Sequence, residues 1–244
     1  MLGQTVNSYH DGEHDFADLL RALGEVSELR RLRFTSPYPT DFTSRVIEAM
    51  ASTPVVCEHV HLPVQSGSNA VLKRMLRRYT RERYLEVVDQ LRGAVPGITL
   101  STDIIVGFPG ETEADFEQTL SLVTDASFDA AYTFKYSVRD GTPAVRLKDH
   151  IPDEAASARL DRLIDTVRAS VRRKNIARVG ESHEVLVERP AKRGDLMLGR
   201  TRTNHLVLLD LPTSAVGQYH NVRLTGTTGS TFTGTVVTPA LALL

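Results

Sequence analysis

The alternation of short apolar segments with longer segments of helical spacing constrains the fold of this 244-residue chain more than any other feature. In residues 84–91 the apolar side chains recur at i, i+3, i+4 and i+7, as on one face of a helix. Strands that alternate with helices at this period pair in parallel through right-handed crossovers. The sequence therefore predicts an α/β sheet or βα barrel over residues 1–150. Its predicted strands are residues 31–35, 60–64, 98–106 and 131–137.

The number of predicted strands is too small for a closed eight-stranded barrel. Counting the end of a strand at residues 2–5, about five strands are present, and a complete barrel of that kind needs more. The chain also begins inside a motif-like stretch, residues 2–9, with no strand of useful length before it. We therefore expect a partial, open parallel βα barrel whose N-terminus is a truncation.

The pattern changes after residue 150, which indicates further domains. Residues 152–178 show the apolar stripe of one long helix, and its end at residues 168–178 carries five cations and no acid. Such a cluster is as typical of a solvated face matched to the helix dipole as of an RNA-facing patch. After residue 180, five short strands separated by Gly and Pro turns are typical of a small all-β, OB-like barrel. The predicted domains are residues 1–150, a connecting basic helix at 151–179, and the β barrel at 180–244.

Composition limits the partners and the compartment. The formal net charge is −1, so a nucleic-acid contact would need a local basic patch. No apolar run approaches the ~20 residues of a membrane span and no secretory signal is visible, so no membrane partner is expected. The single cysteine, Cys57, excludes an internal disulfide and fits a reducing, cytoplasmic location.

Two predicted strands end in loops that suit ligand binding, because ligands of α/β sheets lie beyond the carboxyl ends of the strands. Residues 107–111, Gly-Phe-Pro-Gly-Glu, let the backbone approach a negative group at a helix N-terminus, although glycine in such a loop can equally serve the turn. Residues 65–68, Gln-Ser-Gly-Ser, end the strand before. There Ser68 suits a helix N-cap, and the Gln65 amide suits a ribose or carboxylate.

Polar side chains also occur within the predicted strands. Asp103 lies in an apolar strand, where a carboxylate is costly unless it is paired or binds a ligand, and both outcomes are open. His59 and His61 alternate and therefore share one face of their strand. Such a pair could hold a metal ion with further ligands from neighbouring strand ends. A metal-dependent hydrolase that uses His59 and His61 is therefore one alternative function.

Read together, these segments resemble the methylthiotransferase branch of the radical S-adenosylmethionine (SAM) enzymes, most closely its tRNA-modifying members. A terminal barrel containing Gly199-Arg200-Thr201 resembles that family's TRAM domain. The resemblance covers nearly the whole chain. It implies a transferase that inserts a methylthio group at C2 of N6-isopentenyladenosine next to the anticodon of a tRNA. The matching segments are residues 2–4, 34–37, 59–68, 101–111 and 136–144.

The resemblance also implies a SAM site at successive strand ends. The amino group would lie at the first strand, the ribose or carboxylate at the second and the adenine at the third, with backbone contacts from the fourth. Asp103 joins this set because of its place within the third strand, not because of the resemblance. The expected cofactor-binding residues are Gly3, Gln4, Gln65, Ser66, Asp103, Ile105, Gly107 and Tyr136.

The same resemblance implies 4Fe–4S clusters that this chain cannot ligate. The family holds its clusters through cysteine loops expected upstream of Leu2, and an electron from a donor protein leads to cleavage of SAM to a 5′-deoxyadenosyl radical. Fe–S clusters of this type need several cysteine thiolates. Cys57 lies just before a strand and is expected to pack as a small hydrophobe. The isolated chain is therefore predicted to be catalytically inactive.

The predicted β barrel carries the expected tRNA contacts, because OB-like barrels bind nucleic acid on their early strands. Ordinary surface charge would account for the same residues equally well. A non-catalytic RNA-binding module is therefore a second alternative, and it predicts salt-sensitive tRNA binding that survives replacement of Gln65 and Asp103. The basic residues expected to bind RNA are Arg189, Lys192, Arg193, Arg200 and Arg202.

Overall fold

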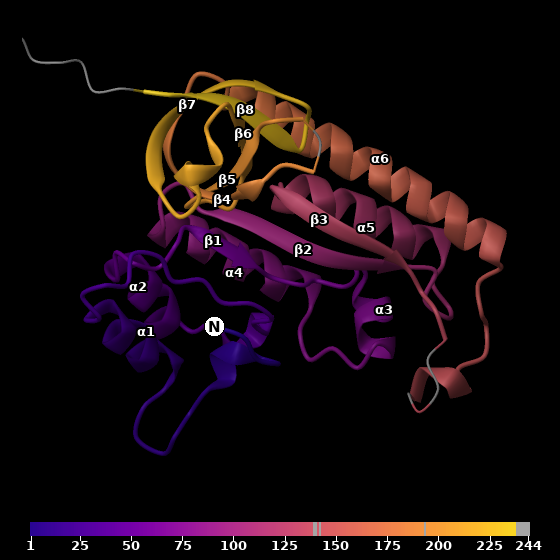
Figure 1. The fold of residues 1–244 in the computed structure, drawn as a ribbon. Coiled ribbons are helices and arrows are strands. Elements are labelled where there is room, and N and C mark those ends of the chain that lie inside the picture. The colour runs from indigo at the N-terminus through magenta and orange to yellow at the C-terminus, as the bar shows by residue number, and fades with distance from the viewer. Residues whose placement is uncertain (139–140, 142, 193, 238–244) are drawn as a thin grey trace, which may run out of the picture. The chain divides into compact units, whose positions relative to one another are not determined.

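The computed structural model describes residues 1–138, 141, 143–192 and 194–237. The chain divides into two compact units, Met1–Ser170 and Val171–Leu244. The long helix α6 (Asp153–Ala177) begins in the first unit and ends in the second. The other helices of the first unit, labelled in Figure 1, are α1 (Phe16–Gly24), α2 (Ser44–Ser52), α3 (Asn69–Arg74), α4 (Arg81–Ala94) and α5 (Glu113–Ala126).

Three strands of the first unit form a parallel sheet in the order β1 (His59–His61), β2 (Thr99–Val106) and β3 (Ala130–Lys135). Helices α3 and α4 connect the first two strands, and α5 connects the last two. The N-terminus of α5 is a capping box in which Thr112 Oγ1 accepts the Asp115 N–H (3.2 Å) and the Asp115 carboxylate accepts the Thr112 N–H (2.9 Å). The predicted parallel pairing is confirmed for these three strands.

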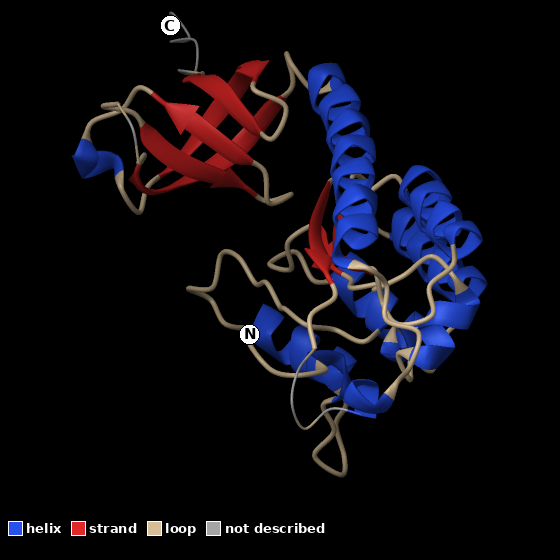
Figure 2. Ribbon diagram, turned by 90° about the vertical axis from the view of Figure 1, so that its right-hand side faces the viewer, coloured by secondary structure: helices blue, strands red, loops and turns tan. Residues whose placement is uncertain are grey.

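The two faces of this sheet differ because successive side chains of a strand point to opposite sides. On one face, residues such as Val60, Leu100 and Ile104 are fully buried. Figure 2 shows the sheet nearly edge-on, with the long helices of this unit on one side of it. The other face carries polar and aromatic side chains, among them Tyr132 and Phe134, which are half exposed. The candidate site lies on this second face.

Two of the predicted strands do not form. Residues 2–5 end in a turn at Thr5, whose φ of 52° is left-handed, and the short helix η1 (Val6–Ser8) follows. The segment at residues 31–35 is reduced to one parallel bridge between Leu32 and Val56. A left-handed φ of 57° at Ser36 ends the extended backbone there. The sheet therefore has three strands where about five were predicted.

The second unit is a closed barrel of five strands in the order β4-β5-β6-β8-β7, in which β6 and β8 are parallel and the other pairs antiparallel. Its core is built of buried aliphatic side chains around Phe232. Gly199 and Gly234 face this core, where a Cβ atom would lie 2.4 Å from Val185 Cγ1 and from Val222 Cγ1, respectively. The strands are β4 (Ser182–Pro190), β5 (Met197–Thr201), β6 (Leu206–Leu209), β7 (Tyr219–Thr227) and β8 (Thr231–Val236).

Among the helices of the described part of the chain, none combines the length and the apolar character that crossing a membrane requires.

Candidate active site

A cavity of about 700 Å³ lies at the carboxyl ends of β2 and β3. Four of the predicted cofactor-binding residues line it, namely Gln65, Asp103, Ile105 and Tyr136. They come from three different strand ends that are far apart in the sequence. The structure therefore brings these four residues to one site, as the parallel sheet predicted.

Gln65 is fixed at the cavity by β2. Its N–H donates to Asp103 O (2.9 Å), and its carbonyl accepts the Ile105 N–H (2.9 Å). The φ angle of Gln65 is 72°, a left-handed value that is uncommon for a residue with a side chain and that is often found at functional sites. These main-chain bonds thus fix the backbone of Gln65 beside Asp103 and Ile105.

Asp103 ends a chain of polar contacts across the exposed face of the sheet. His61 Nε2 lies 3.4 Å from Asp103 Oδ2, and His61 Nδ1 lies 2.9 Å from Ser101 Oγ. His59 Nε2 lies 3.1 Å from the same hydroxyl, and the Tyr132 ring packs edge-on against His61 at 5.8 Å. Asp103 is therefore paired with His61, which is one of the two outcomes considered, and it also lines the cavity.

The proposed metal site at His59 and His61 gains no support from this arrangement. Both imidazoles direct a ring nitrogen at Ser101 Oγ. Within the described residues, no group of three His, Cys, Asp or Glu side chains is placed to hold a metal ion. The geometry fits a hydrogen-bonded polar chain better than a metal centre.

Aromatic rings form the apolar wall of the site. The rings of Phe108 and Tyr136 meet edge-on at 5.0 Å, and the His150 ring stacks on Tyr136 at 6.4 Å. The Tyr136 N–H donates to Val106 O (2.9 Å), which extends the pairing of β2 and β3. The buried Tyr136 hydroxyl has no hydrogen-bond partner among the described residues. Tyr136 therefore lines the cavity, and its ring packs against both Phe108 and His150.

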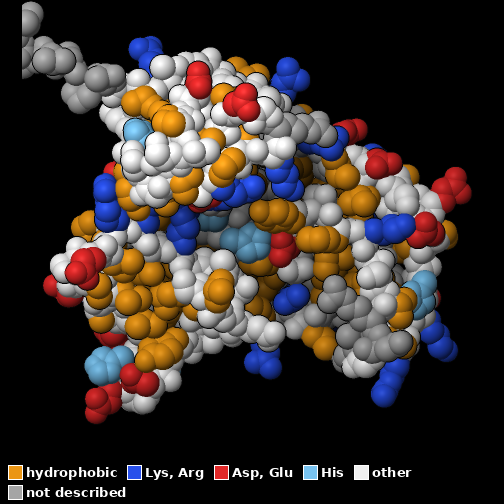
Figure 3. Space-filling model, viewed as in Figure 1, with side chains coloured by type: hydrophobic (Ala, Val, Ile, Leu, Met, Phe, Trp, Pro, Cys, Tyr) orange, Lys and Arg blue, Asp and Glu red, His pale blue; other side chains and the backbone are white. Residues whose placement is uncertain are grey.

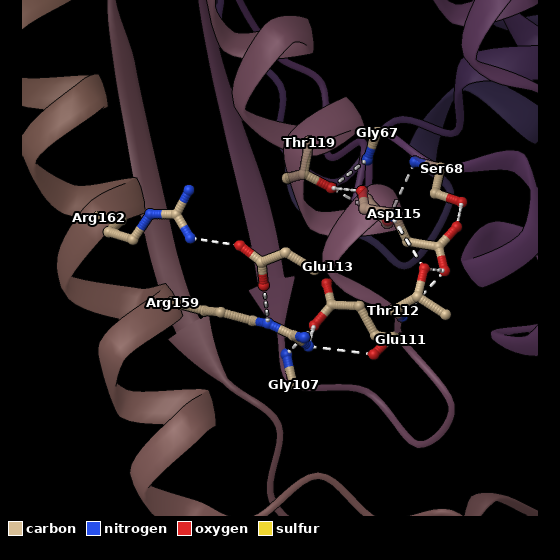
Figure 4. Close-up of polar contacts among 11 residues, drawn as sticks. Gly67, Ser68, Gly107, Glu111, Thr112, Glu113, Asp115, Thr119, Arg159 and Arg162 are labelled. Carbon is tan, nitrogen blue, oxygen red and sulfur yellow. Dashed lines mark hydrogen bonds and ion pairs between the residues drawn. The ribbon is translucent and has the colours of Figure 1, made fainter.

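Gly107 does not line the cavity but contacts residues of the same unit that lie next to it. Its φ is 74°, and a Cβ atom would lie 2.7 Å from Ala156 Cβ of α6. Its N–H donates to the carboxylate of Glu111 (2.6 Å), which also accepts from Arg159 Nη1 (3.0 Å), as Figure 4 shows. Burial raises the pKa of Glu111, and the Gly107 amide and Arg159 oppose that shift. The sequence predicted that the backbone of this loop approaches a negative group, and the group that the Gly107 amide contacts in the structure is the Glu111 carboxylate.

Ser66 also lies away from the cavity. It is fully buried, its hydroxyl accepts the Ser68 N–H (3.2 Å), and it lies 3.4 Å from Thr119 Oγ1 of α5. Ser68 caps α3 and donates to Asp115 Oδ1 (2.5 Å), part of the contacts drawn in Figure 4. The Gln-Ser-Gly-Ser segment therefore divides into one residue at the cavity and three that pack it onto α5.

The remaining predicted cofactor residues, Gly3 and Gln4, are exposed and are not part of the cavity lining. They precede the left-handed Thr5 in a turn, since no strand forms there to direct them at the cavity.

Residues outside the predicted cofactor-binding set complete the cavity. The turn between α3 and α4 contributes Arg74, Met75, Leu76 and Arg77, and the run of cations there is the signal that could have found it. The other additional lining residues are Phe108, Phe134, Lys135, Ser137, Ala144 and Leu147.

The basic residues predicted to bind RNA lie along the β4–β5 hairpin of the barrel. Arg189 and Lys192 are exposed. Arg200 forms a two-pronged ion pair with Glu188 (2.7 and 3.2 Å) and also donates to Asn204. Arg202 lies in the turn after β5, and Arg193 lies outside the described residues. Among the described residues of this set, Arg189 and Lys192 are therefore the exposed cations.

The residues of this chain do not fit a 4Fe–4S cluster. Such a cluster needs several cysteine thiolates, and the sequence has one cysteine. Cys57 is 1% exposed, and its N–H donates to Leu32 O (3.0 Å). The cavity does fit a small organic cofactor, because its volume and its mixture of apolar walls with a few polar groups are typical of such sites.

Comparison with known proteins agrees with this geometry. Residues 1–123 match the Radical SAM superfamily. The fold of coproporphyrinogen III oxidase from Escherichia coli, described as a radical SAM enzyme, aligns with a TM-score of 0.50 at 15% identity, covering 85% of this chain and 50% of that one. The chain belongs to the radical SAM superfamily.

Within the superfamily, the sequence is similar to enzymes named tRNA-2-methylthio-N(6)-dimethylallyladenosine synthase. Those of Alkaliphilus oremlandii and Carboxydothermus hydrogenoformans are each 48% identical over 92% of this chain, and that of Clostridium botulinum (strain Langeland) is 45% identical over 96%. The chain covers 48%, 52% and 53% of those proteins, respectively, so it spans about half their length. The resemblance to the methylthiotransferase branch is confirmed.

Proposed function

We propose that this chain forms the SAM-binding and RNA-binding part of a tRNA methylthiotransferase that modifies C2 of N6-isopentenyladenosine next to the anticodon. The single observation that carries the proposal is the convergence of Gln65, Asp103, Ile105 and Tyr136 on one cavity. The identity of 45–48% to enzymes named for this modification supports the choice of substrate.

In this proposal the cavity residues divide by chemistry. The Gln65 amide and the Asp103 carboxylate suit the hydroxyl and amino groups of SAM, while Ile105 and the Phe108 ring suit its adenine. Bound SAM would supply the deoxyadenosyl group of a radical reaction, which is the chemistry of the cofactor. The part of this chain is to orient SAM and to exclude water from it.

The ligands of the cluster are not among the residues of this chain, which has a single cysteine. We expect the isolated chain to be inactive in reductive cleavage of SAM. Incubation with iron and sulfide under anaerobic conditions should give no cubane absorbance and no 5′-deoxyadenosine. Formation of 5′-deoxyadenosine by the isolated chain would contradict this expectation.

The barrel supports the RNA-binding part of the proposal. Its five strands close into a barrel with one parallel pair, an arrangement that suits an OB-like barrel of the TRAM kind, and OB-like barrels bind nucleic acid. Arg189 and Lys192 would contact the tRNA backbone. If tRNA binds and SAM does not, the non-catalytic RNA-binding module is the better description.

The test of the cofactor site compares Gln65→Ala with Ser66→Ala. We expect Gln65→Ala to weaken SAM binding by roughly 2- to 10-fold, the loss of one hydrogen bond, with little change in stability. Ser66→Ala removes buried contacts to Ser68 and Thr119, so it should lower the unfolding free energy by about 1 kcal/mol and leave SAM affinity unchanged.

Calorimetric titration of the full 244-residue chain with SAM measures the affinity, and urea unfolding measures the stability. Absence of SAM binding in the unsubstituted chain, or equal effects of the two substitutions on affinity, would overturn the proposed site.

A further inference from the structure

The turn between α3 and α4 carries the densest positive charge of the first unit. On the face drawn in Figure 3, Lys and Arg side chains are interspersed with acidic and apolar ones, in keeping with a net charge of −1. Residues 73–83 depart from this balance, with six cations and one acid, Glu82. We call this segment the arginine turn.

The arginine turn is held in a fixed shape. Leu76 has a left-handed φ of 58°, and the N–H groups of Leu76 and Arg77 donate to Lys73 O (3.1 Å) and Leu72 O (2.9 Å), which is the Schellman arrangement at a helix C-terminus. The buried Tyr79 hydroxyl donates to Val64 O (3.0 Å). The cations of the turn are therefore presented by a rigid backbone, so binding to them costs little ordering entropy.

Three of the six cations already have partners in the fold. Arg81 donates to Gly67 O (3.4 Å), Gln118 O and Asp125. Arg83 pairs with Glu86 at 2.9 Å. The Arg74 guanidinium lies on Gly110, where a Cβ atom would lie 2.2 Å from Arg74 Cζ, and it is 3.7 Å from Asp149.

The other three, Lys73, Arg77 and Arg78, have no ion pair with any residue that the structure describes. Lys73 and Arg78 are exposed. The Nε atom of Arg77 is buried and lacks a hydrogen-bond partner among the described residues. Together they line a second hollow beside the SAM cavity, and Arg77 and Leu76 also border the cavity itself.

We propose that the arginine turn binds the phosphodiester backbone of the RNA substrate at the mouth of the SAM cavity, an inference that rests on the proposed function. Three unpaired cations on a rigid loop are suited to successive phosphates, since phosphate contacts position a nucleic acid without reading its sequence. The exposed Leu76 and the neighbouring Arg77 line the cavity, so RNA held by the turn would lie next to bound cofactor. On this proposal the RNA substrate contacts the first unit as well as the barrel of the second unit.

The test uses variants of the full chain in each of which one cation is replaced by glutamine, so that all variants have the same net charge. Lys73→Gln and Arg78→Gln remove cations that do not line the SAM cavity. Arg21→Gln, on an exposed part of α1, is the matched control for net charge. Binding of a labelled, unmodified tRNA transcript is measured by fluorescence anisotropy between about 50 and 200 mM KCl, and SAM affinity is measured in parallel.

We expect each of the two turn variants to lower the slope of log affinity against log salt by about 0.7–0.9, and Arg21→Gln to leave it unchanged. SAM affinity should stay the same in all three variants. Unchanged slopes in Lys73→Gln and Arg78→Gln, no binding of the transcript by the unsubstituted chain, or loss of SAM affinity in the turn variants would overturn the proposal. Failure of SAM binding in the unsubstituted chain, with lowered slopes in the turn variants, would refute the cofactor site alone.

Discussion

Glu111 is the residue whose environment is most demanding, because a carboxylate with 2% of its surface exposed must hold both a backbone amide and a guanidinium. Its second oxygen, Oε1, is buried and has no hydrogen-bond partner among the described residues. Burial therefore disfavours the ionised form, and the ion pair to Arg159 recovers only part of that loss. The pKa of Glu111 is raised as a result.

Because the pKa of Glu111 is raised in the folded state, the unfolding free energy depends on pH in a direction that can be predicted. The folded state binds the Glu111 proton more tightly than the unfolded chain does, so the unfolding free energy falls as pH rises through the ordinary value and the raised one. Glu111→Gln removes that titration. The unfolding free energy of the unsubstituted chain minus that of Glu111→Gln should therefore decrease between about pH 4 and pH 7 in urea unfolding.

Glu113 supplies a control of opposite sign. A hydrogen bond from Arg162 lowers its pKa, so its contribution is present above the ordinary value and is lost as pH falls. The same difference measured with Glu113→Gln should increase with pH, by no more than about 1 kcal/mol because Glu113 is largely exposed. A difference that rises with pH for Glu111→Gln would show that the ion pair outweighs burial.

Two glycines of the first unit have different surroundings, and the contrast shows how closely the segment before α3 is packed onto α5. A Cβ atom on Gly67 would lie 2.4 Å from Gln118 O and 2.5 Å from Thr119 Cα, both backbone atoms of α5 that cannot move aside cheaply. Gly93, near the end of α4, is exposed and would meet nothing within 4 Å. The first glycine is required by a close approach, and the second is not.

We expect Gly67→Ala to destabilise the first unit by about 1–3 kcal/mol, because it forces the segment before α3 away from α5. Gly93→Ala should instead stabilise it by up to about 1 kcal/mol, since alanine loses less backbone entropy in a helix. Thermal unfolding of the two variants measures both. Equal and small effects would mean that the loop before α3 moves without cost.

The elements that the sequence predicted well are those whose signals are local. The long helix and the five strands of the barrel each follow from spacing and turn residues within a short window. The predictions of strands at residues 2–5 and 31–35 were wrong. A strand needs a hydrogen-bonded partner along its whole length, and the turns at Thr5 and Ser36 interrupt the extended backbone.

The candidate site was predictable to the extent that strand ends converge in any parallel sheet, which places Gln65, Asp103, Ile105 and Tyr136 together. Sequence position could not show that Ser66, one residue after Gln65, points the other way into α5. That outcome depends on the left-handed φ of Gln65, which only the tertiary bonds to β2 determine. The arginine turn was overlooked because its role depends on which cations find partners in the fold.

At the scale of the whole molecule, each unit has a hydrophobic core of its own. The core of the second unit gathers side chains of all five barrel strands around Phe232, which is fully buried and meets the His205 ring edge-on at 5.4 Å. The first unit buries Tyr84 and Phe116 with equal completeness. Separate cores of this kind predict separate cooperative transitions.

We expect Phe232→Ala to destabilise the barrel by about 3–5 kcal/mol, because it deletes the largest side chain of a closed core. Hydrogen exchange followed by mass spectrometry reports the two units separately. Amides of β4 to β8 should lose protection, while those of β2 should keep theirs. Phe116→Ala is the reciprocal control and should reduce protection of β2 but not of the barrel. Equal loss of protection in β2 and in the barrel on Phe232→Ala would mean that the two cores unfold as one. In that case, a substitution in the arginine turn could also disturb the RNA contacts of the barrel.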